Sequence, residues 1–200
     1  LGILAVIGIV NRFGAHSTAA IGIAMRIDQL AFLPAMTLGM AVSTLAGQNI
    51  GAGLFDRVRA VFRWGVTVSC GLTLIGSVVA VTLAPRLIGF FTNESDVIEV
   101  GSHYLRIVGP GYLLFAVIFA ANGVINGSGH TGATTVFTFI TFWAVRVPLA
   151  AYLSSHLNSV DGVWYAILAS LAAGTVASLA YYYSGRWKRR VAAPGIRRAE

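Results

Sequence analysis

The sequence has 200 residues, of which 56% are hydrophobic and only 10% are charged, and its mean hydropathy is +0.77. Soluble domains carry about 25% charged residues, so this composition excludes an ordinary soluble domain and predicts a membrane protein. The net charge of +7 comes mostly from basic residues that flank apolar segments, which is typical of membrane topology and does not indicate a nucleic-acid-binding surface. The apolar runs are ~20 residues or longer, so we expect an all-α, polytopic helical bundle and not a β-barrel.

Five full transmembrane helices and part of a sixth are expected. Residues 1–10 are apolar but too few to cross a bilayer, and they lack the basic start of a signal peptide. We therefore interpret them as the second half of a helix that begins upstream. The full spans are predicted at about 18–48, 55–83, 97–126, 133–153 and 163–183. Residues 1–183 then form a single transmembrane unit, and residues 184–200 form a basic, loosely ordered tail.

Glycine and proline residues predict where these helices end or bend. Gly47, Gly51 and Gly53 are expected to end or bend the second span, and residues 127–132 to form a tight turn after the fourth. The segment 109–111 reads Gly-Pro-Gly within the fourth span. Because proline removes a backbone hydrogen bond and clashes with the preceding turn, a kink is expected there.

The loop charges predict the orientation of the chain in the membrane. With alternating spans, the turn near residue 53, the turn near residue 129 and the tail lie on one side, whereas the other side carries Arg12, Arg86 and an acidic loop. Basic residues mark the cytoplasmic side, so the first group and the C-terminus are predicted to be cytoplasmic. The basic residues of that group are Arg57, Arg59, Arg63, Arg186, Lys188, Arg189, Arg190, Arg197 and Arg198.

No arrangement typical of a catalytic or metal site occurs in the sequence. None of the four histidines is followed by a second metal-binding residue three or four positions later, and no phosphate-binding loop follows a strand. A membrane-embedded enzyme needs a histidine clustered with an aspartate or serine at a helix mouth, and no such cluster is present. We therefore predict a protein that is not an enzyme and that has no catalytic residue, no metal site and no cofactor.

Charged and polar residues inside a membrane are costly, so each is a functional candidate. Arg26, Asp28 and Gln29 lie near the outer end of the second span. One interpretation is an interfacial pair, in which Arg26 and Asp28 reach the headgroups or neighbouring helices and neutralise each other. The other is that Asp28 and Gln29 line an outward-opening cleft for a cationic solute.

The fourth and fifth spans carry further candidates. Asn122 and Asn126 share one helix face, so they either join helices or face a cavity. Phe115 and Phe119 form a stripe that either packs against another helix or stacks on a substrate. Arg146 precedes Pro148 by two residues and is expected to bond to carbonyl groups that the proline leaves free.

Three segments make the sequence resemble the C-terminal lobe of multidrug and toxic compound extrusion (MATE) transporters. The first is the second span, which contains Arg26 and Pro34 and ends in GQNIGAG at residues 47–53. The second is NGVINGSGHT at 122–131, and the third is RVPLAAYL at 146–153. Together with the helix order and the loop charges, the resemblance covers nearly the whole chain. The motif residues that match are Arg26, Gly47, Gln48, Asn49, Gly51, Gly53, Gly127, Gly129, Arg146 and Pro148.

The resemblance implies a fold of twelve helices in two six-helix lobes, of which this chain is one. It implies a secondary antiporter in the bacterial inner (plasma) membrane that exports cationic or lipophilic drugs in exchange for protons or sodium ions. The partners implied are small-molecule substrates, the lipid bilayer and an N-terminal lobe of the same polypeptide, and not nucleic acid. The candidates for the substrate cleft are Asp28, Gln29, Pro34, Phe115, Phe119 and Asn122.

One departure from the family pattern concerns ion coupling. Some sodium-coupled members carry a carboxylate in the span that corresponds to 97–126, where this sequence has only Glu99 at the outer mouth. We therefore expect the coupling ion, a proton or Na⁺, to bind in the lobe outside this sequence. Two alternatives remain open: a lipid-linked oligosaccharide flippase of the same superfamily, which would need several cations around its cleft, and an inactive, truncated membrane protein.

Overall fold

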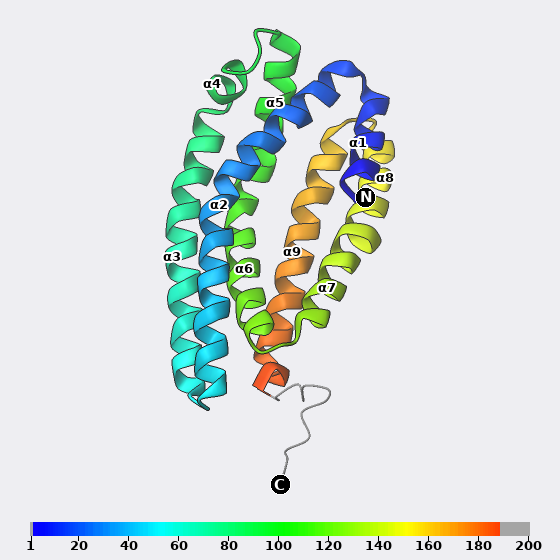
Figure 1. Ribbon diagram of the computed structural model, residues 1–200. Helices are drawn as coiled ribbons and strands as arrows, with labels where there is room; N and C mark the ends of the chain where they lie inside the picture. The colour runs from blue at the N-terminus through cyan, green and yellow to red at the C-terminus, as the bar shows by residue number, and fades with distance from the viewer. Residues whose placement is uncertain (1, 189–200) are drawn as a thin grey trace.

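A computed structural model describes residues 2–188, and these residues form a tall helical bundle (Figure 1). Its helices are α1 (Gly2–Val10), α2 (Ala15–Gly51), α3 (Phe55–Thr82), α4 (Ala84–Gly89), α5 (Ser95–Val108), α6 (Tyr112–Gly127), α7 (Thr131–Phe139), α8 (Val147–Leu157) and α9 (Asp161–Tyr183). Three 3₁₀ turns, η1 (Asn11–Phe13), η2 (Gly109–Gly111) and η4 (Arg186–Lys188), and one π-helical segment, η3 (Ile140–Arg146), complete the described chain.

Five helical segments are long and apolar enough to cross a membrane, which confirms the predicted fold class of five full spans and part of another. Two of the five are composite: α5, η2 and α6 form one span, and α7, η3 and α8 form another. The shorter apolar segment is Gly2–Phe13. The five full spans are Ala15–Gly51, Phe55–Thr82, Ser95–Gly127, Thr131–Leu157 and Asp161–Tyr183.

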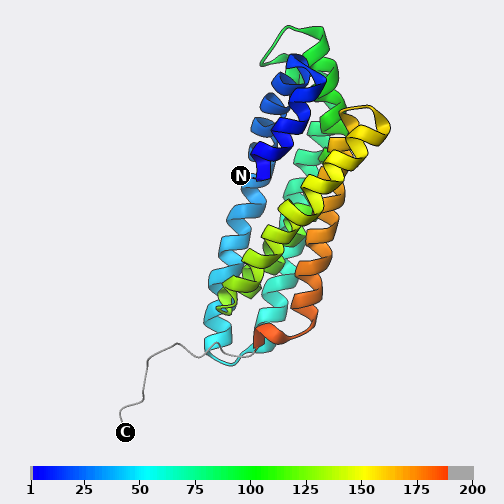
Figure 2. The same cartoon turned by 90° about the vertical axis from the view of Figure 1, so that its right-hand side faces the viewer.

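The turns that join the spans gather at the two ends of the bundle. The α2–α3 turn, the α6–α7 turn and the end of α9 lie at one end, and η1, α4 and the α8–α9 turn lie at the other (Figures 1 and 2). This grouping is the one that the orientation prediction requires. Gly53 and Gly129 have positive φ angles of 74° and 87°, which glycine adopts without a steric cost, so they form the turns at the first end.

Two of the three prolines inside the full spans, Pro110 and Pro148, accompany a break in the α-helix. The kink predicted at 109–111 is confirmed, because the 3₁₀ turn η2 separates α5 from α6 there. Pro34 lies inside α2, which stays helical and bends along its length (Figure 1). The π-helical turn η3 directly before Pro148 was not predicted, and such turns are frequent at functional sites.

Part of the predicted tail is ordered, contrary to the sequence analysis. Trp187 in η4 is only 2% exposed, and its indole N–H donates to the carbonyl oxygen of Tyr182 at 2.7 Å. An indole ring buries a large apolar area, which fixes this turn against α9 and α3. The basic residues Arg189, Arg190, Arg197 and Arg198, which the prediction also used, lie outside the described residues.

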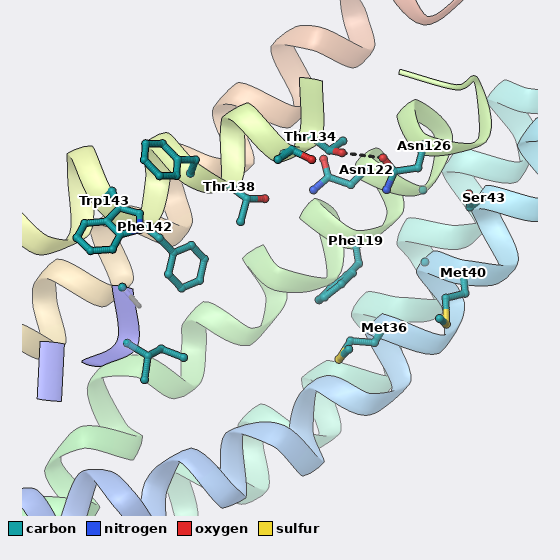
Figure 3. A pocket seen from close by; sticks show the side chains of 16 residues that line it. Met36, Met40, Ser43, Phe119, Asn122, Asn126, Thr134, Thr138, Phe142 and Trp143 are labelled. Atoms are coloured by element: carbon teal, nitrogen blue, oxygen red, sulfur yellow. Dashed lines mark hydrogen bonds between the residues drawn. The ribbon is translucent and has the colours of Figure 1, made fainter. Parts of the chain in front are cut away.

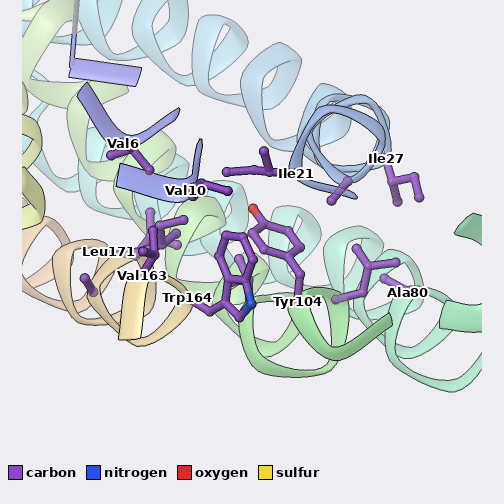
Figure 4. Close-up of a cluster of buried hydrophobic side chains, with 14 of the residues drawn as sticks. Val6, Val10, Ile21, Ile27, Ala80, Tyr104, Val163, Trp164 and Leu171 are labelled. Atoms are coloured by element: carbon purple, nitrogen blue, oxygen red, sulfur yellow. The ribbon is translucent and has the colours of Figure 1, made fainter. Parts of the chain in front are cut away.

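Two buried apolar clusters hold the bundle together. The larger one surrounds Tyr104 and Trp164, whose rings meet edge to face at 4.8 Å, and it joins α1, α2, α5 and α9 (Figure 4). The smaller one lies toward the end that carries the α2–α3 turn and includes Phe62 of α3, stacked on Tyr182 of α9. Between them, α2 and α6 run side by side.

Glycines set the distance between α2 and α6. A methyl group on Gly123 would lie 2.6 Å from the carbonyl oxygen of Gly39, and one on Gly47 would lie 3.0 Å from that of Gly127. The two backbones therefore touch at two levels, as small residues allow in membrane helices. Gly47 lies inside α2 and therefore does not end it, whereas Gly51 is the last residue of the helix and Gly53 lies in the turn that follows, as predicted for this group of glycines.

We predict that Gly127→Ala lowers the melting temperature of the purified full-length protein by several degrees. The added methyl group would meet the backbone carbonyl of Ser43, and overpacking of this kind costs about 1–3 kcal/mol. Gly71→Ala in α3 is the matched control, because nothing lies within 4 Å of its new methyl group. Equal melting temperatures for the two variants would show that this contact is not tight.

Candidate functional site

A cavity of about 760 Å³ opens between α2, α6 and the segment formed by α7 and η3, with the start of α1 at its edge (Figure 3). We call it the cleft cavity. Its larger apolar side chains are Ile3, Met36, Met40, Phe119, Phe139, Phe142 and Trp143. Its polar side chains are Ser43, Asn122, Asn126, Thr134, Thr135 and Thr138. Among the residues that the structure describes, no charged side chain lines it.

The two asparagines join helices and also face the cleft cavity. The hydroxyl of Ser178 on α9 donates to Asn122 Oδ1 at 2.9 Å, and that of Thr134 on α7 donates to Asn126 Oδ1 at 2.7 Å. These bonds use the carbonyl oxygens and leave both amide NH₂ groups without a partner within the described chain. Two NH₂ groups are thus available to donate hydrogen bonds to a ligand in the cavity.

The predicted cleft residues divide into two groups. Phe119 and Asn122 line the cavity, whereas Asp28, Gln29, Pro34 and Phe115 are not among its lining residues. Phe115 packs within the lobe between its neighbours: its ring stacks on Phe32 at 4.0 Å and lies 5.1 Å from that of Phe119. Gln29 is exposed on α2, away from the buried face of that helix.

Asp28 lies in a buried polar cluster. Asp28 is only 8% exposed. Each of its carboxylate oxygens accepts a hydrogen bond from one tyrosine hydroxyl. Tyr104 of α5 donates to Oδ2 and Tyr112 of α6 donates to Oδ1, both at 2.5 Å. Asp28 is the only buried carboxylate among residues 2–188. The cluster ties α2 to both halves of the kinked span.

The interpretation that Arg26 and Asp28 neutralise each other is wrong, whereas the bonds to neighbouring helices that were also considered are present for Asp28. The two residues are two positions apart, which places them about 200° apart around the helix. Arg26 is exposed, and its guanidinium lies 6.0 Å from the centre of the Phe91 ring, while Asp28 faces the core. No cation lies within salt-bridge distance of Asp28 in the described part of the chain.

Arg146 is a buried cation whose charge acts on this cluster. It is 8% exposed at the end of η3 and interacts electrostatically with Asp28 and Tyr104 without forming a salt bridge. Its Nε donates to the hydroxyl of Ser170 at 2.7 Å, and its guanidinium lies 4.1 Å from the centre of the Phe142 ring. The predicted bonds to carbonyl groups freed by Pro148 are therefore replaced by a hydroxyl and an aromatic face.

Sequence reasoning missed the two tyrosines that hold Asp28. Tyr104 and Tyr112 lie eight residues apart, on either side of the Gly-Pro-Gly kink, and no short-range spacing links them to Asp28. It also missed the cavity residues of α2 and α7. The signal available for these was helical spacing, since Met36 and Met40, and Thr134 and Thr138, each recur after four residues.

Comparison with known proteins identifies the family. The MatE family model matches residues 2–152, which is more than half of the chain. The chain belongs to the MatE family. Its membership agrees with the fold and with the prediction that the protein is not an enzyme, because the family consists of transporters. The chain is a multi-pass membrane protein.

The relatives extend this result. The chain is 34% identical to the probable multidrug resistance protein YpnP of Bacillus subtilis, over 94% of this chain and 42% of that protein. It is 27% identical to the probable multidrug resistance protein NorM of Thermotoga maritima, over 94% of this chain and 41% of that protein. The chain thus spans less than half the length of the curated relatives that it matches.

Solved structures share the fold. The chain superimposes on the MATE transporter ClbM in complex with Rb⁺ with a TM-score of 0.86, covering 94% of this chain and 44% of that one at 21% identity. It superimposes on a MOP superfamily transporter from Pyrococcus furiosus with a TM-score of 0.84, covering 92% of this chain and 41% of that one at 19% identity. At these identities the likeness concerns the fold alone.

We predict that Tyr104→Phe lowers the free energy of unfolding by about 1–3 kcal/mol. The substitution removes the donor to Oδ2 and leaves a buried carboxylate oxygen without its partner. Thermal unfolding of the full-length protein in detergent measures the effect. Tyr152→Phe is the matched control, because Tyr152 is 62% exposed and its hydroxyl has no partner within residues 2–188. The assigned bond is wrong if the two variants melt together.

Proposed function

We propose that the full-length protein containing this chain is a secondary antiporter that exports cationic or lipophilic compounds. The observation that carries the proposal is the cleft cavity, whose walls combine aromatic rings and thioethers with neutral hydrogen-bonding groups. Aromatic faces attract cations, and methionine side chains adapt to ligands of different shape. A pocket of this chemistry holds a class of lipophilic compounds and not one polar metabolite.

Support for drug efflux also comes from relatives. YpnP, YoeA and NorM are each named as probable multidrug resistance proteins. In the proposed mechanism, a second lobe of the same polypeptide closes the other side of the cavity, and the two lobes rock around the bound compound. We place the protein in the bacterial inner membrane, with the α2–α3 turn and the C-terminus in the cytoplasm as the loop charges predict.

For the coupling ion, we propose that Asp28 exchanges a proton or Na⁺ with the outer solution. A carboxylate inside a membrane protein is costly unless a proton or a cation compensates its charge, and Asp28 is buried without a salt bridge. The sequence alone favours a site in the other lobe, because residues 97–126 lack a midmembrane acid. The burial of Asp28 on α2 favours a site in this lobe instead.

A row of aromatic rings connects Asp28 to the cleft cavity. Tyr112 donates to Asp28 and meets the ring of Phe32 edge to face at 5.1 Å. Phe32 stacks on Phe115, which lies against Phe119 in the cavity wall. A change in the bonding of Asp28 that moves the Tyr112 ring can therefore displace the cavity wall through direct contacts.

The flippase alternative finds no support in the cavity. A site for a lipid-linked diphosphate needs several cations, and no arginine or lysine lines the cavity within the described chain. Arg26 and Arg106 are exposed elsewhere, and Arg146 is held by Ser170 and Phe142. The geometry thus favours export of cations or neutral compounds over anions.

We predict that Phe119→Ala reduces ethidium efflux several-fold at low substrate concentration. The substitution removes an aromatic wall of the cavity, and an aromatic face contributes about 0.5–2 kcal/mol to cation binding. Efflux from cells that express equal amounts of the full-length protein is the measurement. Phe90→Ala is the control, because Phe90 is 86% exposed near the opposite end of the bundle. Unchanged efflux for Phe119→Ala contradicts a substrate role of the cavity.

We predict that Asp28→Asn abolishes exchange driven by an ion gradient while ethidium binding is retained. The amide keeps the shape of the side chain but cannot gain and lose a charge. Uptake into proteoliposomes with an imposed proton or sodium gradient is the measurement, and Glu99→Gln, an exposed position on α5, is the control. Coupled transport that survives in Asp28→Asn places the coupling site in the other lobe, as the sequence analysis expected.

A further inference from the structure

A second groove runs between α2 and α3, on a different face of α2 from the cleft cavity. It has a volume of about 480 Å³, and its lining includes Leu38, Leu45 and Asn49 of α2 and Arg57, Trp64 and Val68 of α3. We call it the α2–α3 groove. Leu38 is about 200° around α2 from Met36, which lines the cleft cavity, so the two hollows occupy opposite faces of this helix.

The groove has the length of one lipid leaflet. The α2 residues that line it extend from Leu38 to Asn49, and the α3 residues extend from Arg57 to Val68, which is eleven residue steps in each helix. At about 1.5 Å per residue, either wall is roughly 16 Å long, against about 15 Å for half of a ~30 Å hydrocarbon core. Its floor is shallow because α2 and α3 approach closely: a methyl group on Gly65 would lie 2.5 Å from Val42 Cγ2.

One end of this apolar groove carries an unpaired positive charge. Arg57 lines the groove two residues after the start of α3, where the helix N-terminus adds further positive potential. No carboxylate within residues 2–188 lies within salt-bridge distance of Arg57, and the adjacent Asp56 pairs with Arg59 at 3.1 Å. Asn49 lies at the same end and uses its NH₂ group on the carbonyl oxygen of Leu45, so the guanidinium is the main donor available there.

The other arginines of this helix face a different direction. Arg59 and Arg63 interact electrostatically with Tyr182 of α9, and neither lines the groove. The positive charge at the mouth of the groove therefore comes from Arg57 specifically. Trp64 forms part of the wall and is 69% exposed, as is typical of side chains that contact lipid near the membrane interface.

We propose that the α2–α3 groove binds an anionic phospholipid, with one acyl chain along the groove and the phosphate at Arg57. Anionic headgroups attract basic residues beside a membrane span, and the groove ends at the depth where such a headgroup lies. Charge, length and apolar lining together fit this occupant, and they do not depend on which compound the protein transports. The site differs from the cleft cavity in both its residues and its ligand.

The experiment uses the full-length protein, purified in detergent and incubated with dioleoyl phosphatidylglycerol or dioleoyl phosphatidylcholine. Native mass spectrometry counts the bound lipid, and thermal unfolding measures the stabilisation that it gives. We expect tighter binding of phosphatidylglycerol, and we expect Arg57→Gln to weaken it roughly fivefold, the value of one basic residue near an anionic headgroup. Phosphatidylcholine binding should be unchanged in this variant.

Arg63→Gln is the matched control, because it removes the same charge from the same helix outside the groove. We expect it to leave phosphatidylglycerol binding unchanged. Equal losses in Arg57→Gln and Arg63→Gln overturn the proposal, because they indicate a diffuse electrostatic effect. So does the absence of bound phosphatidylglycerol on the wild-type protein, which is the result expected if another part of the polypeptide covers the groove.

A soluble competitor separates a lipid site from a phosphate site. Glycerol 3-phosphate offers the same phosphate chemistry as the headgroup but has no acyl chain. We expect that a large excess leaves phosphatidylglycerol bound, because the apolar lining of the groove holds the acyl chain and glycerol 3-phosphate has none. Displacement of the lipid by glycerol 3-phosphate overturns the proposal, since it assigns the binding to the arginine alone.

Discussion

The direct contact of the α2 and α6 backbones determines the layout of this lobe. Gly39 faces Gly123 and Gly47 faces Gly127, so the helices approach more closely than side chains would allow. In a membrane, helix association relies on packing and hydrogen bonds because lipid supplies no hydrophobic driving force. This close contact holds α2 in one rotation about its axis. That rotation turns Asp28 toward α5 and α6, and it places Met36 and Met40 on the cleft cavity.

The faces of α2 thereby lie in three different environments. One face of α2 carries Asp28 into the protein core, a second lines the cleft cavity, and a third, from Leu38 to Asn49, lines the α2–α3 groove. The sequence of α2 alone does not distinguish these faces, because nearly every position is apolar or small. What separates the faces is the neighbour that each one meets: the tyrosines of a kinked span, an open cavity, or a groove beside α3.

The sequence predicted the spans and their order because apolar length is a strong local signal. It also predicted the kink at Gly109–Gly111, because a proline between two glycines breaks the hydrogen-bond pattern whatever surrounds it. The position of Asp28 could not be predicted in the same way. Arg26 is nearby in sequence, but on a helix these residues point apart, and the donors to Asp28 come from positions 76 and 84 residues away. Similarly, Asn122 was placed on the right helix face, but its bond to Ser178 depends on how α6 meets α9.

The bonding of Asp28 explains how a proton there can affect the cavity. An ionised carboxylate only accepts hydrogen bonds, and both oxygens now accept from tyrosines. A protonated carboxyl group must also donate, and the same two hydroxyl oxygens already lie within hydrogen-bond distance. A tyrosine that accepts this bond must find a new acceptor for its own hydrogen, and the described residues show no other partner for either hydroxyl. A buried donor without a partner costs about 1–3 kcal/mol, so the ring is driven to move. If that ring is Tyr112, its contact with Phe32 carries the displacement through Phe115 to Phe119 in the cavity wall.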